Sequence, residues 1–268
     1  MWINIIAGAV LGALAAIVIN LVVKRTTLAD SVKRTVQIVA VTATVVIGVN
    51  LIGPPLQAQY SISEAEENLL NQPDYAAMKK HEPEAYQQMM AILRDGLKAG
   101  NSVADIQVAA RSVLTGLLEK RMPVAGDAAV VDYMKVSMRE LREIHAGGDD
   151  ACYTFLNPAS GKPFDVTKRV SSVTMEADGR ALAAVIESAA TAPQPRVNLA
   201  EHEVSFVKVV EKLQAKYGDD LAMLDKPQTT PTAKRRVCEM TADLYDDIFA
   251  MPSDQAGKLI RALLGTDS

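Results

Sequence analysis

The sequence predicts an all-α protein in which a two-helix transmembrane hairpin is followed by an irregular helical soluble domain of about eight helices. Two long runs near the N-terminus carry no charged side chain, which is typical of membrane spans. After them, apolar residues recur every three to four positions, the period of an amphipathic helix. The 268 residues therefore divide into a hairpin anchor (1–56) and a soluble helical domain (57–268).

The two uncharged runs cover residues 2–23 and 35–53. At about 1.5 Å of rise per residue, each is long enough to cross a hydrocarbon core of about 30 Å. Two buried core helices are the alternative, but two such runs in succession are unusual in a soluble protein. The first run also lacks the basic start and small-residue cleavage site of a signal peptide, so we expect it to be retained.

The connector between the two runs predicts the orientation of the anchor. It holds four basic residues, Lys24, Arg25, Lys33 and Arg34, whereas the nearest basic residue after the second run is Lys79. Because basic short loops stay in the cytoplasm, the connector is predicted to be cytoplasmic. Both termini and the soluble domain then lie outside, which in a bacterium with two membranes is the periplasmic side of the inner membrane.

Small residues recur every fourth position on one face of each predicted span. Such spacing lets helix backbones approach closely within a lipid bilayer. The two spans are therefore predicted to pack on each other, although association between copies of the chain through the first span is an open alternative. The packing residues are Gly8, Gly12 and Ala16 on the first span, and Ala40, Thr44 and Gly48 on the second.

Caps and apolar stripes predict the first four soluble helices. Ser63 and Glu66 form a possible capping box for a helix that ends near Asn71, and Pro83 opens a helix that Gly100 closes. Ser102 and Asp105 begin a third helix, and Gly147 and Gly148 end a fourth. The predicted inward faces are Val103, Ile106, Ala110, Val113 and Leu117 on the third, and Val131, Met134, Met138, Leu141 and Ile144 on the fourth.

Residues 148–174 look irregular, and residues 164–170 (FDVTKRV) alternate weakly enough to suggest a short extended piece. A helix is then predicted over residues 175–190, and Ser253 is predicted to cap the last one. Between them lie two amphipathic helices. The predicted inward faces are Val204, Val207, Val210, Leu213 and Tyr217, then Val237, Met240, Leu244 and Ile248, and finally Leu259, Ile260 and Leu263.

The only two cysteines are Cys152 and Cys238. In an oxidising compartment, two cysteines in one domain indicate a disulfide, which would stabilise the fold by about 4–5 kcal/mol. Two buried free thiols are the alternative. The predicted periplasmic location favours the disulfide, and the absence of a C-x-x-C pair argues against a redox active site.

The charge distribution excludes some functions. The first 56 residues carry four basic side chains and one acidic side chain, and the whole chain has a net charge of −4, so the soluble domain carries −7. An acidic domain with few aromatic residues is a poor nucleic-acid binder. The one basic triplet, Lys234 to Arg236, is interpreted as a solvated helix face.

No catalytic motif is complete in this sequence. His81, His145 and His202 are far apart, and the His202 region lacks the second histidine of H-E-x-x-H because Phe206 stands there. Residues 160–163 lack the glycine and the hydroxyl residue that a phosphate-binding loop needs. Three adjacent aspartate pairs are interpreted as caps or solvated surface: Asp149 with Asp150, Asp219 with Asp220, and Asp246 with Asp247. We expect no cofactor, no metal and no enzymatic activity.

This layout, a hairpin anchor with a helical extracytoplasmic domain, resembles that of membrane-bound immunity proteins that neutralise toxins delivered to the periplasm. The resemblance is one of architecture. It implies a protein partner, while the −7 charge of the domain favours a basic partner and argues against nucleic acid. The alternatives are an envelope assembly component that associates into homo-oligomers, and a periplasmic enzyme that uses carboxylates.

Overall fold

The structure is a computed structural model that describes residues 63–64, 67–148, 150–157 and 164–265. Over these ranges the chain is all-helical and contains no strand. None of the helices in this described part is both long and apolar enough to span a bilayer. The predicted spans lie outside it, as do Gly8, Gly12, Ala16, Ala40, Thr44, Gly48, Lys24, Arg25, Lys33 and Arg34.

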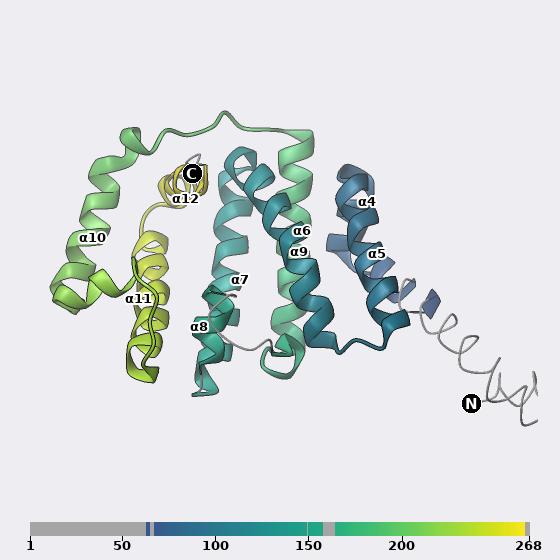
Figure 1. Ribbon diagram of the computed structural model, residues 1–268. Helices are drawn as coiled ribbons and strands as arrows, with labels where there is room; N and C mark the ends of the chain where they lie inside the picture. The colour runs from purple at the N-terminus through teal and green to yellow at the C-terminus, as the bar shows by residue number, and fades with distance from the viewer. Residues whose placement is uncertain (1–62, 65–66, 149, 158–163, 266–268) are drawn as a thin grey trace, which may run out of the picture. The chain divides into compact units, whose positions relative to one another are not determined.

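Residues Leu69–Ser268 form one compact unit, whose first group of helices is α4 (Pro73–His81), α5 (Pro83–Ala99), α6 (Val103–Arg121) and α9 (Ser172–Thr191) (Figure 1). As predicted, Pro83 opens α5, and Gly100 ends it with a φ of 72°, a backbone conformation that glycine adopts without strain. Ser102 and Asp105 form the reciprocal capping box of α6. The core shared by this group is Ala77, Met78, Met89, Leu117, Leu182, Ala183 and Ile186.

The second group consists of α7 (Asp127–Ala146), α8 (Ala151–Leu156), α10 (Glu203–Tyr217), α11 (Pro231–Phe249) and α12 (Ser253–Leu264). The α7 helix is central because it contacts α8, α11 and α12 in this group and α9 in the other. Its predicted inward stripe is confirmed, since all five residues are buried. Short 3-10 turns complete the chain: η2 (Met122–Val124), η4 (Val166–Lys168), η5 (Leu199–His202) and η6 (Gly218–Met223).

The expected extended piece at residues 164–170 is wrong. The Asp165 side chain accepts a hydrogen bond from the Thr167 amide at 3.0 Å, which closes the 3-10 turn η4 instead. The stretch 148–174 also contains α8, and α9 begins at Ser172 with Ser171 as its cap. Ser253 is the first residue of α12 and not its cap, a position that Pro252 holds.

Candidate functional site

The α10 helix exposes an apolar stripe to solvent. Val204, Val207 and Val210 are 72%, 44% and 38% exposed. The sequence predicted these valines to face the core, and that prediction is wrong. Leu213 and Tyr217 of the same predicted face are buried, as predicted, at 3% and 7% exposed, and Val209, which was not predicted, joins them at 1%. The helix is apolar on two faces, and the structure buries only one of them.

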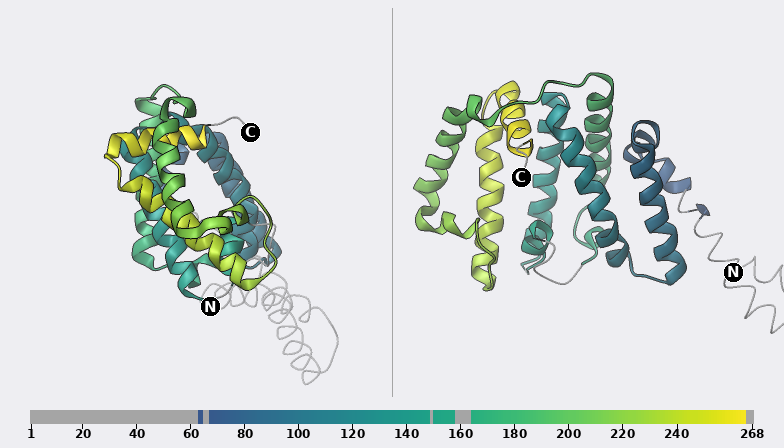
Figure 2. Two further views of the ribbon diagram at one scale, coloured as in Figure 1. Left: turned by 90° about the vertical axis from the view of Figure 1, so that its left-hand side faces the viewer. Right: turned by 45° about the horizontal axis from the view of Figure 1, so that its top comes forward.

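The location of α10 explains why one face has no partner among the described residues. The helix forms one end of the second group and contacts α11 together with the turns η5 and η6, all on its inner side (Figures 1 and 2). In the left view of Figure 2, α10 lies in front of α11 and faces the viewer. A rigid helix with an uncovered apolar stripe is a surface suited to a protein partner.

Charged side chains border the valine stripe. Glu203, Lys208 and Glu211 are exposed and lie on the same outward side of α10 at helical spacing. Within the described part of the chain, none of the three forms an ion pair. The border therefore carries two acidic side chains and one basic side chain.

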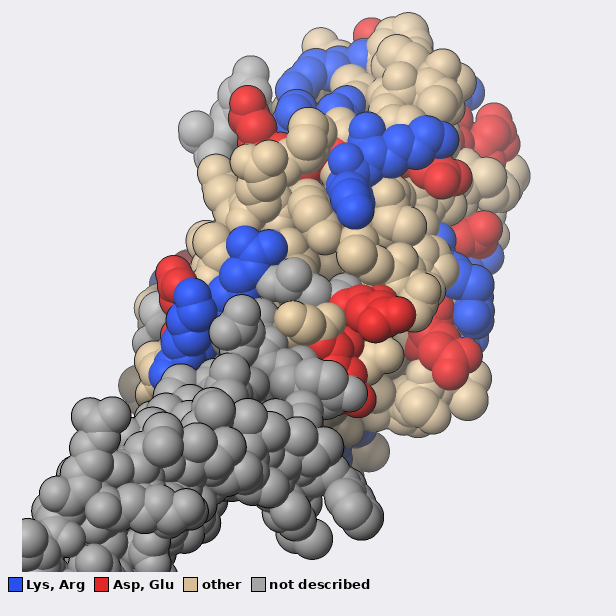
Figure 3. Space-filling view, turned by 90° about the vertical axis from the view of Figure 1, so that its right-hand side faces the viewer, with Lys and Arg blue, Asp and Glu red and all other residues tan. Residues whose placement is uncertain are grey.

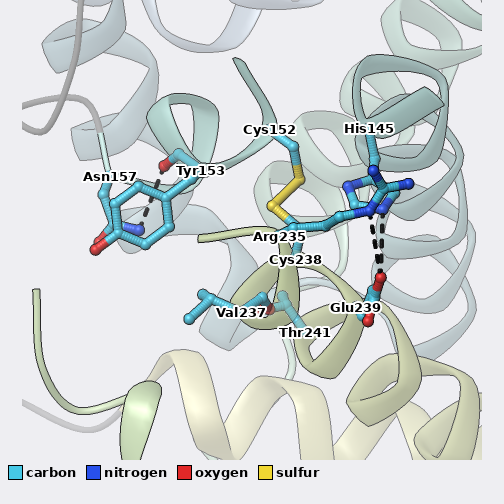
Figure 4. The surroundings of a disulfide bond; sticks show 9 residues. All are labelled: His145, Cys152, Tyr153, Asn157, Arg235, Val237, Cys238, Glu239 and Thr241. Atoms are coloured by element: carbon cyan, nitrogen blue, oxygen red, sulfur yellow. Dashed lines mark hydrogen bonds and ion pairs between the residues drawn. A yellow bond between two sulfur atoms is a disulfide. The ribbon is translucent and has the colours of Figure 1, made fainter. Parts of the chain in front are cut away.

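The predicted disulfide between Cys152 and Cys238 is present. It joins α8 to α11, with a Cα–Cα separation of 6.3 Å, and both cysteines are almost fully buried. Figure 4 shows His145, Arg235 and Glu239 beside it. Because it connects residues 86 positions apart, the bond ties the α11 end of the bundle to α8 through a long loop.

A pocket of about 320 Å³ adjoins this disulfide between α7, α10 and α11. The pocket combines basic and acidic side chains over an apolar floor. Its lining residues are Leu141, Arg142, His145, Lys216, Tyr217, Arg236, Cys238, Glu239, Ala242 and Asp243. Sequence patterns did not predict this pocket, because its lining comes from three helices distant in the chain.

The carboxylates of the pocket are paired with cations. Asp243 accepts hydrogen bonds from Lys216 and Tyr217. Burial raises the pKa of Asp243, but the bonds from Lys216 and Tyr217 outweigh it and hold that pKa below its usual value. Glu239 lies 3.6 Å from Arg235 and 3.5 Å from Arg236. Asp243, whose pKa is held low in this way, is a weak general base, since efficient proton transfer needs a pKa near the working pH.

The aspartate pairs also form ion pairs between helices. Asp150 lies 2.7 Å from Lys234, Asp220 lies 3.1 Å from Arg236, and Asp247 lies 3.0 Å from Lys212. Asp246 pairs with Arg142, and Asp149 lies outside the described residues. Asp150 does not cap α8 with its side chain, contrary to the sequence interpretation. The basic triplet is likewise ion-paired, and the Lys234 side chain is only 14% exposed.

The three histidines stay apart in the structure. His81 ends α4, where its Nε2 atom is buried without a hydrogen bond. His202 ends η5, and His145 lies near the end of α7 with its Nε2 atom 3.9 Å from Glu239. Only His145 has cysteine ligand atoms close to it.

A second acidic cluster lies between α4, α7 and α9. Burial, followed by repulsion from Asp178 and Glu143, raises the pKa of Glu140 to about 8. Burial and the neighbouring Asp74 raise the pKa of Asp178 to about 6, and burial also raises that of Asp74. No cation of the described chain pairs with these three carboxylates. Sequence reasoning missed this cluster because the three residues come from separate helices.

The surface at the α4–α5 end carries both signs of charge. Lys and Arg side chains and Asp and Glu side chains are interspersed there, with no continuous basic field on the visible face (Figure 3). No family model, no curated protein and no solved structure matches this chain, so the functional argument rests on its own geometry.

Proposed function

We propose that this chain is a membrane-anchored binding protein whose helical domain recognises a protein partner through the outward face of α10. The observation that carries the proposal is the exposed stripe of Val204, Val207 and Val210 on a rigid helix. Protein interfaces combine an apolar centre with a polar rim, and this stripe with its acidic border has that composition. The partner is a protein with an apolar patch and a basic rim.

The anchor and its location belong to the same proposal. The uncharged runs 2–23 and 35–53 support an anchor in the bacterial inner membrane, and the basic connector supports a periplasmic domain. The disulfide supports an oxidising compartment. A periplasmic binding domain with an acidic rim suits a toxin-neutralising immunity protein, which is the most specific form of the proposal.

A binding role also agrees with the state of the polar groups. Around the pocket, Asp243 and Glu239 are neutralised by lysine and arginine partners. Four of the six aspartates that the sequence singled out form ion pairs that connect α7, α8, α10 and η6 to α11: Asp150, Asp220, Asp246 and Asp247. These groups act as structural links between helices, and we propose that the chain is not an enzyme.

Topology is tested by two fusions to the C-terminus of the full chain. Alkaline phosphatase is active only after export, whereas green fluorescent protein fluoresces only when it folds in the cytoplasm. We expect an active phosphatase fusion and a dark fluorescent fusion. The reverse pair of results would place the domain in the cytoplasm and remove the periplasmic part of the proposal.

Binding is tested by isolating the tagged full chain from its own host in a mild detergent. We expect one partner protein at one-to-one stoichiometry, released progressively as salt rises because screening shortens the reach of the acidic rim. A homo-oligomer without any other chain would favour an envelope assembly component. In that case the small-residue faces of the predicted spans become the interface to examine.

A further inference from the structure

Three potential metal ligands from three helices meet beside the pocket. His145 comes from the end of α7, Cys152 from α8 and Cys238 from α11. The two sulfur atoms and one ring nitrogen of His145 all lie within 4.8 Å of one another. Figure 4 shows the His145 ring next to the disulfide. The fold therefore brings together three ligands that form no recognisable metal-binding motif in the sequence.

This ligand set suits zinc. Thiolate sulfur binds Zn²⁺ at about 2.3 Å and imidazole nitrogen at about 2.0–2.1 Å, and two cysteines with one histidine form a known three-ligand zinc set. In a tetrahedral site those bond lengths separate neighbouring ligand atoms by roughly 3.4–3.8 Å. The three atoms are already within 4.8 Å, so side-chain rotation suffices once the two sulfurs are no longer bonded to each other.

The surroundings supply the rest of a zinc site. The Glu239 carboxylate lies 3.9 Å from Nε2 of His145, so a small side-chain movement would bring it to the hydrogen bond by which carboxylates orient metal-bound histidines, with Nδ1 left for the metal. His145, Cys238 and Glu239 also line the pocket of about 320 Å³. That pocket gives the ion a route from solvent and leaves room for a water molecule as the fourth ligand.

We propose that the reduced chain binds one Zn²⁺ through His145, Cys152 and Cys238, and that this metal site and the disulfide exclude each other. A dithiol reductant opens the disulfide by giving it two electrons and two protons, and becomes a cyclic disulfide itself. Zn²⁺ then replaces the two thiol protons, which pass to solvent. Either state connects α8 to α11, so the same two helices are held together before and after oxidation.

The test compares zinc binding by the full chain in detergent under two redox conditions. One sample is reduced with a phosphine, which is then removed under inert gas, and the other is left oxidised. Zn²⁺ is titrated in competition with a coloured chelator. We expect one equivalent to bind the reduced chain and none to bind the oxidised chain. Equal binding by both samples, or binding by neither, would overturn the proposal.

Variants identify the ligands. Glu239→Gln should weaken zinc binding by about 10–100-fold, the usual effect of losing a group that orients a ligand. His145→Gln should weaken it at least as much, whereas His202→Gln, which changes a distant histidine, should leave it unchanged. Undiminished binding by the Cys152→Ala, Cys238→Ala double variant would show adventitious metal and refute the site.

Cobalt gives a readout that does not depend on the variants folding. Thiolate-bound Co²⁺ in a tetrahedral site shows a sulfur-to-metal charge-transfer band and intense visible bands. The reduced full chain should develop both with one equivalent of Co²⁺ and lose them when Zn²⁺ is added. A spectrum without the charge-transfer band would rule out cysteine ligation.

Discussion

The acidic side chains at the two ends of the helical domain have different surroundings. At the α10–α11 end, Asp243, Asp247 and Asp220 each have a lysine or arginine partner, and the disulfide adds a covalent link. At the α4–α9 end, Asp74, Glu140 and Asp178 are enclosed without a cation among the described residues. The α10–α11 end therefore has paired carboxylates, whereas the α4–α9 end contains three carboxylates whose raised pKa values make them keep their protons more readily.

This difference suggests a division of roles. An end that is tied covalently and by ion pairs can keep a helix in place while one apolar face of that helix stays uncovered, as α10 requires. The α4–α9 end has no disulfide; its buried Glu82 pairs with Lys120 and Arg121 of α6, and the helices pack around an apolar core centred on Met78 and Ile186. We therefore expect the α10–α11 end to respond to reduction, and the α4–α9 end to respond to pH.

Loss of the disulfide should have the largest effect on stability. Replacing Cys152 and Cys238 together by alanine should lower the free energy of unfolding by about 4–5 kcal/mol, because the bond constrains a long loop in the unfolded chain. Urea unfolding of the full chain measures the change, and hydrogen exchange should show faster opening of α8 and α11. A loss below about 1 kcal/mol would mean that the covalent tie does not distinguish this end.

The acidic cluster should make stability fall as pH rises. The folded pKa of Glu140 is raised to about 8, so the folded state keeps a proton that the unfolded state has released. The resulting stabilisation is complete below the unfolded pKa of about 4.3 and is lost as pH rises through the folded value. Allowing for partial exposure, we expect a loss of roughly 2 kcal/mol between about pH 5 and about pH 9.

Unfolding temperatures measured between about pH 5 and about pH 9 test whether the acidic cluster causes this loss of stability. The Glu140→Gln, Asp178→Asn double variant should flatten the pH dependence, because neither side chain then titrates. Asp246→Asn, at the other end of the domain, is the matched control and should leave the dependence of the unfolding temperature on pH unchanged. Equal flattening by both variants would show that the pH response is not confined to the α4–α9 end.

The exposed ion pair between Arg142 and Asp246 should have the smallest effect. Their side chains are 46% and 55% exposed, so a double-mutant cycle should give a coupling energy of about 0.2–1 kcal/mol. The coupling should shrink in high salt. A coupling energy above about 2 kcal/mol would show that ion pairs, and not the disulfide alone, make a large contribution to the stability of the α10–α11 end.

Sequence periodicity predicted the helices with one apolar face and failed where that condition did not hold. The α7 stripe was predicted correctly because its apolar residues occupy a single face. On α10, Leu213 and Tyr217 were predicted correctly, but Val204, Val207 and Val210 were assigned to the core because two apolar faces overlap in the pattern, and only tertiary packing selects Val209 in their place. The α4 helix was missed because its polar residues leave only Ala77 and Met78 buried.

Only some features of the candidate sites could be predicted from the sequence. The disulfide followed from there being two cysteines in a predicted oxidising compartment. The approach of His145 to the sulfurs, the pocket and the acidic cluster all depend on how distant helices cross. No local pattern encodes such crossings, because each helix contributes a single side chain.

The most direct test of the proposed function measures the affinity of the captured partner for two valine variants. Val207→Asp places a charge in the α10 stripe, and Val173→Asp places the same charge on an exposed valine of α9, which is 67% exposed. Both variants should unfold at the wild-type temperature. We predict that Val207→Asp weakens the complex at least tenfold, equivalent to about 1.4 kcal/mol, while Val173→Asp leaves the dissociation constant within about twofold. Equal affinities for both variants would contradict the assignment of α10 as the binding surface.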